Sequence, residues 1–251
     1  MDMYPNLWIF DTYSIFLFLG VVACLFIYMK YANHMKLNKK YSYDILMLAC
    51  ISIILGILSA FGFQFLFDSL KENSTNPLFA MTFFGGLVGG VVTFLVGYFT
   101  VMKRRYPNES FVSNVLIIAP ACITIAHGFG RIGCFFAGCC YGIETDSIWG
   151  IKFPHLDHNV FPTQLYEAIF LFILFGVLFV LAYRFKFKFT FSVYLASYGI
   201  FRFLIEFIRG DDRGAYFLGL SPSQMFSLVG IIISIILIVF VNKKKNAIEA
   251  D

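Results

Sequence analysis

The sequence predicts an all-α membrane protein with seven transmembrane helices. This prediction rests on composition, on the length of the apolar runs and on the charges between them. Of the 251 residues, 59% are apolar and only 14% are charged, whereas soluble domains carry about 25% charged residues. The apolar runs are continuous and approach the roughly 20 residues that a spanning helix needs, which argues against the alternating segments of a membrane β-barrel. The length suits one bundle, so we expect residues 1–251 to form a single integral membrane domain.

Seven apolar runs are long enough to be spans, and the sixth is the least hydrophobic because it contains Arg202 and Glu206. The fifth follows Pro162 and Thr163, and a proline followed by a polar residue favours the start of a helix. In chain order, the expected spans are Tyr13–Met29, Ile45–Phe67, Leu78–Met102, Phe111–His127, Gln164–Tyr183, Phe189–Ile208 and Ser221–Val241.

The basic residues between the spans predict the orientation, because cytoplasmic loops carry an excess of Lys and Arg. Alternate connections hold 13 of the 19 basic residues: Lys30, Lys36, Lys39, Lys40, Lys103, Arg104, Arg105, Arg184, Lys186, Lys188, Lys243, Lys244 and Lys245. The N-terminus is therefore expected outside and the C-terminus in the cytoplasm. Topology also explains the net charge of +4, which is no evidence for nucleic-acid binding.

One polar segment, His127–Gly142, reads HGFGRIGCFFAGCCYG and opens the longest expected outer connection, residues 128–163. Long connections without a clear helix are usually functional or disordered, and ionisable residues at membrane depth indicate function. We interpret 128–163 as an outer-face active-site loop. The alternative is a structural loop that its glycines keep compact.

Two arginines suit a phosphate group. On a helix, Tyr198, Arg202, Glu206 and Arg209 fall on one stripe, so Glu206 can hold Arg202 while the guanidinium fork grips an anion. Arg131 lies between Gly130 and Gly133, which allow a ligand to approach the backbone. The competing interpretation is a structural ion pair that fixes helix register.

Two further features, a glutamate and a pair of glycines, leave alternatives open. Glu167, beside Gln164 and Tyr166 at the start of the fifth span, either meets solvent or pairs with an arginine of the site. In the third span, Gly85 and Gly86 begin small-xxx-small pairs that favour close helix packing, although they would also leave room for a lipid head group.

The cysteines of the polar segment allow several interpretations of their role. Cys134, Cys139 and Cys140 could form a disulfide on an oxidising outer face, or one could be a nucleophilic thiolate near Arg131 and His127. Zinc is less favoured because no paired CxxC spacing occurs, and we assign neither metal nor cofactor. Cys24, Cys50 and Cys122 lie in spans and are expected to pack as small apolar residues.

Several motifs resemble the bacterial prolipoprotein diacylglyceryl transferases, which have seven membrane helices and an outer N-terminus. The GRIGNF signature is met by Gly130-Arg131-Ile132-Gly133-Cys134-Phe135, with Tyr141-Gly142 at the family's spacing. HPSQLYE corresponds to residues 161–167, FPTQLYE, and YGxxRFxxExxRxxD to residues 198–212. Gly85-Gly86 in the third span, and Gln224 and Ser227 near the last, complete a similarity that covers nearly the whole chain.

The resemblance implies a membrane transferase that moves the diacylglyceryl group of phosphatidylglycerol onto the lipobox cysteine of an exported preprotein, at the outer face of a bacterial cell membrane. Glycerol phosphate leaves and a thioether forms. By this resemblance, Arg131 and Arg202 would bind or stabilise the phosphate and Tyr198 would line the site. We expect the catalytic residues to be Arg131, Arg202, His127 and Cys139, and the substrate-binding residues to be Gly130, Cys134, Gln164, Tyr166, Glu167, Tyr198, Glu206, Arg209, Gly85 and Gly86.

Departures from the family pattern concern proton handling and the acceptor. Cys134 and Ala137 replace two asparagines of the signature and Cys139 replaces its glutamate, while Phe84 and Phe161 replace two histidines. His127 or a cysteine of the segment is then the remaining candidate for the proton-handling group. A different acceptor with the same donor, a lipid-binding protein without catalysis and a thiol–disulfide protein stay open as alternatives.

Overall fold

The structure, a computed structural model, describes residues 12–70, 79–210 and 219–248. In this part of the chain it contains seven helices long and apolar enough to span a membrane, as the sequence predicted. The fold is all-helical apart from isolated β-bridges, and the chain is a multi-pass membrane protein. The orientation of its termini stays a prediction.

The chain divides into two compact units, which we describe separately. The larger contains the residues up to His34 and those from Phe111 onward. Its elements are α1 (Thr12–His34), η2 (Val112–Leu116, a π-helix), α5 (Ala119–Phe136), α6 (Thr163–Tyr183), α7 (Thr190–Ile205), η3 (Glu206–Ile208, a 3₁₀ turn) and α8 (Pro222–Ile248).

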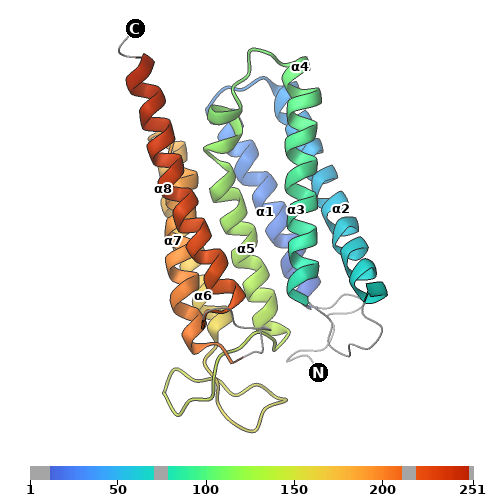
Figure 1. The fold of residues 1–251 in the computed structure, drawn as a ribbon, viewed down its shortest axis with the longest axis vertical. Coiled ribbons are helices and arrows are strands. Elements are labelled where there is room, and N and C mark those ends of the chain that lie inside the picture. The colour runs from blue at the N-terminus through green and yellow to red at the C-terminus, as the bar shows by residue number, and fades with distance from the viewer. Residues whose placement is uncertain (1–11, 71–78, 211–218, 249–251) are drawn as a thin grey trace. The chain divides into compact units, whose positions relative to one another are not determined.

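Packing in the larger unit follows the chain order from α5 to α8, with α1 added against α5 (Figure 1). A Cβ atom on Gly20 would lie 2.9 Å from the backbone oxygen of Ala126, so the two helices approach at backbone distance. The Tyr31 hydroxyl donates to the Ser113 carbonyl at 2.6 Å, and the buried Thr190 hydroxyl donates to the Ile117 carbonyl at 2.7 Å. These bonds satisfy carbonyls beside the π-helical stretch before Pro120, where the regular backbone ladder is interrupted.

The smaller unit, residues 35–110, consists of α2 (Lys39–Leu70), α3 (Phe79–Gly97), η1 (Tyr98–Met102) and α4 (Lys103–Arg105). Gly86 and Gly90 let α3 lie against α2, because added Cβ atoms would meet Ala60 at 3.2 Å and the Ser52 carbonyl at 3.3 Å. At the basic end, Asp44 pairs with Arg105 at 3.0 Å.

Two helix ends beside the polar residues differ from the prediction. The fourth span was expected to end at His127, but α5 continues to Phe136, so Arg131 and Cys134 lie on a helix and the connection comprises residues 137–162. The apolar partners of α1 explain the extension: a Cβ on Gly133 would lie 3.1 Å from the Tyr13 ring, so the glycine fits a helix contact. The stripe at the end of the sixth span was predicted to be α-helical through Arg209, but α7 ends at Ile205 and Arg209 is extended, with φ −80° and ψ 141°.

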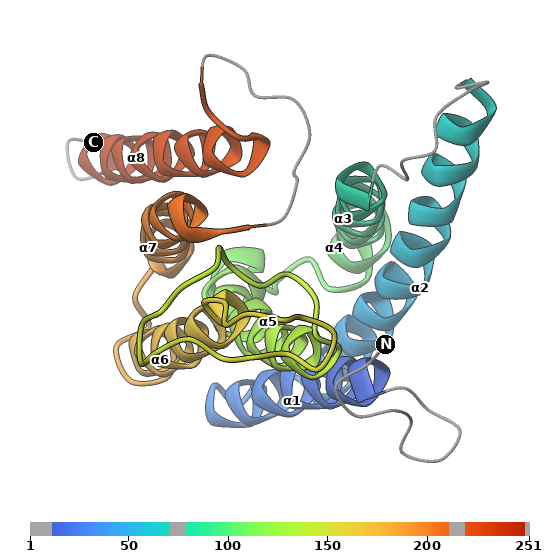
Figure 2. The ribbon, with the colours of Figure 1, turned by 90° about the horizontal axis from the view of Figure 1, so that it is seen from below.

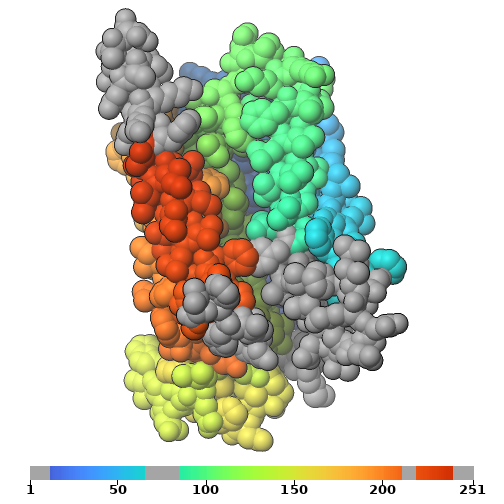
Figure 3. All heavy atoms as spheres, in the orientation of Figure 1, coloured from blue at the N-terminus to red at the C-terminus, as the bar shows by residue number. Residues whose placement is uncertain are grey.

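The connection folds back over the ends of α5 and α6 (Figure 2), and Figure 3 shows its side chains gathered in one compact mass. Short bridges join Glu144 and Ile151 to Val160, and Gly142 bridges to the extended Arg209. Phe153 is fully buried against Phe135 and Tyr141. The connection is thus an ordered cap over the end of the larger unit where its polar residues gather.

Candidate functional site

A buried carboxylate, Glu167 on the first turns of α6, lies at the centre of the polar residues of the larger unit. Its Oε2 atom is 3.0 Å from Nε of Arg131 on α5 and 3.8 Å from Nη1 of Arg209. Its Oε1 atom accepts a hydrogen bond from the Tyr198 hydroxyl at 2.8 Å and lies 3.7 Å from Nε2 of His127. The prediction that Glu167 pairs with an arginine is confirmed, and the solvated alternative is wrong.

A second ion pair lies at the end of α7, where Arg202 Nη1 is 2.7 Å from Glu206 Oε2. This confirms the predicted pair at the i and i+4 positions. The other arm of Arg202, Nη2, donates to the Ser223 hydroxyl at 2.9 Å. The guanidinium is therefore held at two points by different elements, which fixes its plane.

The start of α8 supports the second ion pair. Ser221 caps this helix: its hydroxyl accepts from the Gln224 N–H at 3.3 Å, and the Gln224 side chain accepts from the Ser221 N–H at 3.0 Å. The same hydroxyl donates to Glu206 Oε1 at 2.6 Å. Sequence reasoning missed Ser221 and Ser223, although the order Ser-Pro-Ser-Gln is a capping-box signature with proline at the first helical position.

Charge in this cluster favours an anion. Within the described part of the chain, the ion pairs of this cluster join three arginines, Arg131, Arg202 and Arg209, to two carboxylates, Glu167 and Glu206. The two glutamates are almost completely shielded from solvent, and so is Arg202. An anion bound here would be attracted more strongly than in water, because the surroundings screen charge less.

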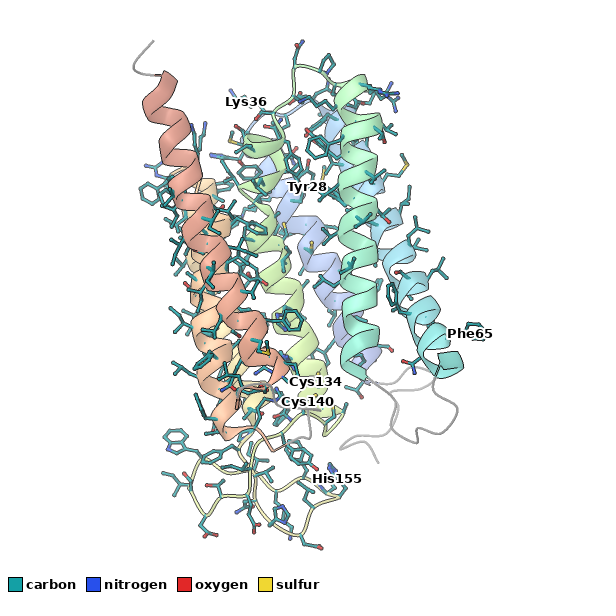
Figure 4. All side chains as sticks on the ribbon, in the orientation of Figure 1. Tyr28, Lys36, Phe65, Cys134, Cys140 and His155 are labelled. Carbon is teal, nitrogen blue, oxygen red and sulfur yellow. The ribbon has the colours of Figure 1, made fainter. Side chains whose placement is uncertain are left out.

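The three cysteines of the polar segment converge at the end of α5, where Figure 4 shows Cys134 and Cys140 close together. The Sγ atoms of Cys134, Cys139 and Cys140 all lie within 4.8 Å of one another, and all three thiols are free. Gly138 and Cys140 have left-handed backbone conformations, with φ of 64° and 63°, which turn the chain back over the helix end. The predicted disulfide is not formed in this structure, and a thiol role stays a prediction.

Two of these thiols lie beyond the spanning segment and differ in acidity. Hydrogen bonds from the Cys134 and Cys139 thiols lower the pKa of Cys140, and the positive charges of Arg209 and Arg131 act in the same direction. The hydrogen bond with Cys134, followed by that with Cys140, raises the pKa of Cys139. The pKa of Cys139, the predicted catalytic cysteine, is therefore shifted in the opposite direction to that of Cys140.

The remaining predicted residues divide into those at the cluster and those away from it. Gln164 is fully buried and donates to the Cys139 carbonyl at 2.7 Å, while its own Oε1 atom accepts no hydrogen bond within the described chain. Gly130 lies beside Arg131, and a Cβ there would meet nothing within 4 Å. The Tyr166 hydroxyl instead donates to the Trp149 carbonyl at 3.1 Å and so contacts the connection.

Gly85 and Gly86 lie in the smaller unit, where their added Cβ atoms would meet Phe63 and Ala60 of α2. The packing interpretation therefore has direct support, and a role in binding lipid stays a prediction. Asp212, which belongs to the third motif, lies outside the described residues.

Comparison with known proteins agrees with the motifs. The family profile of prolipoprotein diacylglyceryl transferase matches residues 7–240. The phosphatidylglycerol–prolipoprotein diacylglyceryl transferase of Clostridium tetani is 33% identical over 233 residues, which is 89% of this chain and 90% of that protein. Phosphatidylglycerol–prolipoprotein diacylglyceryl transferase 2 of Clostridium perfringens is 32% identical over 251 residues, or 95% of this chain and 93% of the relative. The transferase of Geobacter sulfurreducens is 31% identical over 252 residues, or 94% of this chain and 92% of the relative.

Proposed function

The chain belongs to the prolipoprotein diacylglyceryl transferase family, and we propose that it moves the diacylglyceryl group of phosphatidylglycerol onto the lipobox cysteine of an exported preprotein, at the outer face of a bacterial membrane. The observation that carries this proposal is the buried cluster of Arg131, Arg202 and Arg209 around Glu167 and Glu206. Charged groups among membrane helices are costly, and they persist where they bind substrate or one another.

The phosphodiester of phosphatidylglycerol carries one negative charge, which suits a cluster whose described ion pairs contain more arginines than carboxylates. Arg131 and Arg202 are the guanidiniums that would bind it, since each is already oriented by a carboxylate and keeps further N–H donors. The unpartnered Oε1 atom of Gln164 is a buried acceptor that suits a hydroxyl of the glycerol head group.

In the reaction, the acceptor sulfur attacks the glyceryl carbon that bears the phosphate ester. A C–S bond forms, the C–O bond to phosphate breaks, and its electron pair leaves on glycerol phosphate. Negative charge grows on the departing phosphate, so donors already fixed beside it lower the barrier without rearranging. Arg131 and Arg202 would supply these donors, while Glu167 and Glu206 would hold them in place.

The acceptor thiol has to lose its proton before or during attack. His127 Nε2 lies 3.7 Å from Glu167 Oε1, and a carboxylate beside an imidazole orients the ring. His127 is therefore the side chain of the cluster that suits proton transfer. The cysteines of the α5 end are the other candidates, because the glutamate and asparagines of the family signature are cysteine and alanine here.

The decisive experiment supplies phosphatidylglycerol radiolabelled in its acyl chains to the purified protein in lipid nanodiscs, with a lipobox peptide as acceptor. A matched peptide with serine in place of cysteine is the control. We expect label on the cysteine peptide and none on the serine peptide. Label transferred to another molecule would replace the acceptor, phospholipid binding without turnover would indicate a lipid-binding protein, and peptide oxidation without transfer would indicate thiol–disulfide chemistry.

A further inference from the structure

Three thiols at the end of α5 lie close enough together to hold a metal ion, which the spacing of the cysteines in the sequence did not indicate. We propose that Cys134, Cys139 and Cys140 bind one zinc ion and that its fourth coordination position receives the acceptor's cysteine thiol. The proposal that the trio binds zinc depends on the thiol geometry alone. The proposal that zinc receives the acceptor thiol rests on the proposed transferase function.

The positions of the sulfur atoms suit a single ion. All three Sγ atoms lie within 4.8 Å of one another, and tetrahedral zinc with Zn–S bonds of about 2.3 Å places its sulfur ligands about 3.8 Å apart. Small side-chain rotations therefore bring the three thiols onto one ion. A disulfide would use only two of them, whereas thiophilic metals such as zinc engage all three.

The backbone holds the three ligands together without help from an ion. The left-handed conformations of Gly138 and Cys140 turn the chain back over the helix. The carbonyls of Cys139 and Cys140 then accept hydrogen bonds from the side chains of Gln164 and Thr163, both buried at the start of α6. Partners that fix the ligands in this way are typical of metal centres, where surrounding hydrogen bonds orient the coordinating residues.

The charges around the trio favour the metal-bound form. Three thiolates and one Zn²⁺ carry one net negative charge, and Arg131 is one helical turn before Cys134. Cys139 is the most exposed of the three cysteines, so the trio is open to solvent at this residue. Catalytic zinc sites typically have three protein ligands and an open fourth position for water or substrate.

An acceptor thiol that binds at this fourth position loses its proton without a protein base. Coordination releases the S–H proton to water and leaves a zinc-bound thiolate. That sulfur then forms the C–S bond to the glyceryl carbon and leaves the metal, while the C–O bond breaks and its electrons depart with glycerol phosphate. No oxidant or reductant is needed. The neutral thioether binds zinc weakly, so water or the next acceptor thiol replaces it.

Metal content tests the first half, without any measurement of transfer. The full-length protein, purified in detergent without chelator and supplied with zinc, should contain about one zinc per chain by mass spectrometry of the elements. Cys134→Ser and Cys140→Ser should reduce this at least tenfold, and Cys50→Ser, a cysteine in the other unit, should leave it unchanged. A wild-type protein that takes up no zinc, or whose three thiols are found as disulfides, would overturn the site.

Cobalt in place of zinc tests the second half. Thiolate-to-cobalt absorption should rise when the lipobox peptide is added and stay constant with the serine peptide, even with no phospholipid present. The ring of His155 lies 2.9 Å from the Cβ that an alanine at Gly138 would carry. It is therefore the nearby side chain that could act as the fourth ligand in place of the peptide. His155→Ala should leave the spectrum of the peptide-free protein unchanged. Loss of the tetrahedral spectrum in His155→Ala, or no response to the peptide, would refute acceptor coordination.

The two proposals fail in different ways. Normal transfer by zinc-free protein would remove the role of the metal and leave the transferase function intact. Bound zinc and a cobalt response to the peptide, together with no transfer from phosphatidylglycerol, would support the metal site and contradict the proposed reaction.

Discussion

Glu167 Oε2 lies 3.0 Å from Nε of Arg131, and no part of the Glu167 side chain reaches solvent. The same carboxylate also contacts Tyr198 and lies near His127 and Arg209. A single buried anion therefore organises donors from α5, from α7 and from the segment after α7. Its neighbours can act on a phosphate only while it holds them in place.

Glu167→Gln should disable the protein and destabilise it. The amide keeps the shape of the side chain but removes the negative charge that lies beside Arg131 and Arg209. Removing one partner of a buried ion pair typically costs about 3–5 kcal/mol of stability. Because Arg131 would also lose the carboxylate that orients it, transfer to the lipobox peptide should fall by at least about 100-fold. Glu144→Gln, in the exposed part of the connection, is the control and should behave as wild type. Equal rates and equal unfolding midpoints in both variants would contradict the central role of Glu167.

Arg202→Lys should weaken phosphate stabilisation while keeping the charge. Arg202 reaches Glu206 and Ser223 with separate arms of its guanidinium, and an ammonium lacks this fork. Losing one hydrogen bond to a charged group costs about 1.5–3 kcal/mol, or about 10- to 100-fold in kcat/KM for phosphatidylglycerol. Arg184→Lys, at the exposed end of α6, is the matched control. Full activity in Arg202→Lys, with activity lost in Cys139→Ser, would reject the phosphate site in favour of thiol chemistry.

Gly130→Ala tests whether substrate approaches the backbone at Gly130, because the change should lower transfer without lowering stability. A Cβ at Gly130 would meet nothing within 4 Å, and alanine is the better helix former by about 1 kcal/mol. The variant should therefore be at least as stable as wild type. If phospholipid approaches the backbone beside Arg131, the added methyl group should displace it, and a shift of about 1 Å can cost about 100-fold in rate. Gly176→Ala, also in open space but on α6, should gain stability without losing activity. Wild-type transfer by Gly130→Ala would show that the glycine is not needed for substrate.

Ser221→Ala should affect stability more than Ser223→Ala does. Ser221 caps α8 and also donates to Glu206, whereas the Ser223 hydroxyl accepts the second arm of Arg202. Loss of a helix cap costs about 1 kcal/mol, so Ser221→Ala should lower the midpoint of thermal unfolding and Ser221→Thr should restore it. Ser223→Ala should mainly lower transfer. The reverse order of the two alanine variants would mean that the capping box does not support the ion pair.

Local patterns in the sequence were enough for the spans and for one ion pair. The seven spans were predictable because the hydropathy of a spanning helix is a property of its own residues. The Arg202–Glu206 pair was predictable because residues four apart on a helix are neighbours whatever the rest of the fold does. Arg131 was predicted to bind phosphate because an arginine within an apolar region needs an anionic partner, and this role stays a prediction.

Tertiary structure decided which anion holds Arg131 and where the thiols meet. Glu167 lies near the start of a separate helix, 36 residues after Arg131. Only the packing of α6 against α5 makes the two residues partners. Cys139 and Cys140 reach Cys134 because the chain turns left-handed at Gly138 and Cys140, a conformation that the spacing of cysteines cannot reveal. Sequence thus determined which residues are costly to bury, because that cost is local. The fold decided how the cost is offset, because the compensating charges and hydrogen bonds come from distant parts of the chain.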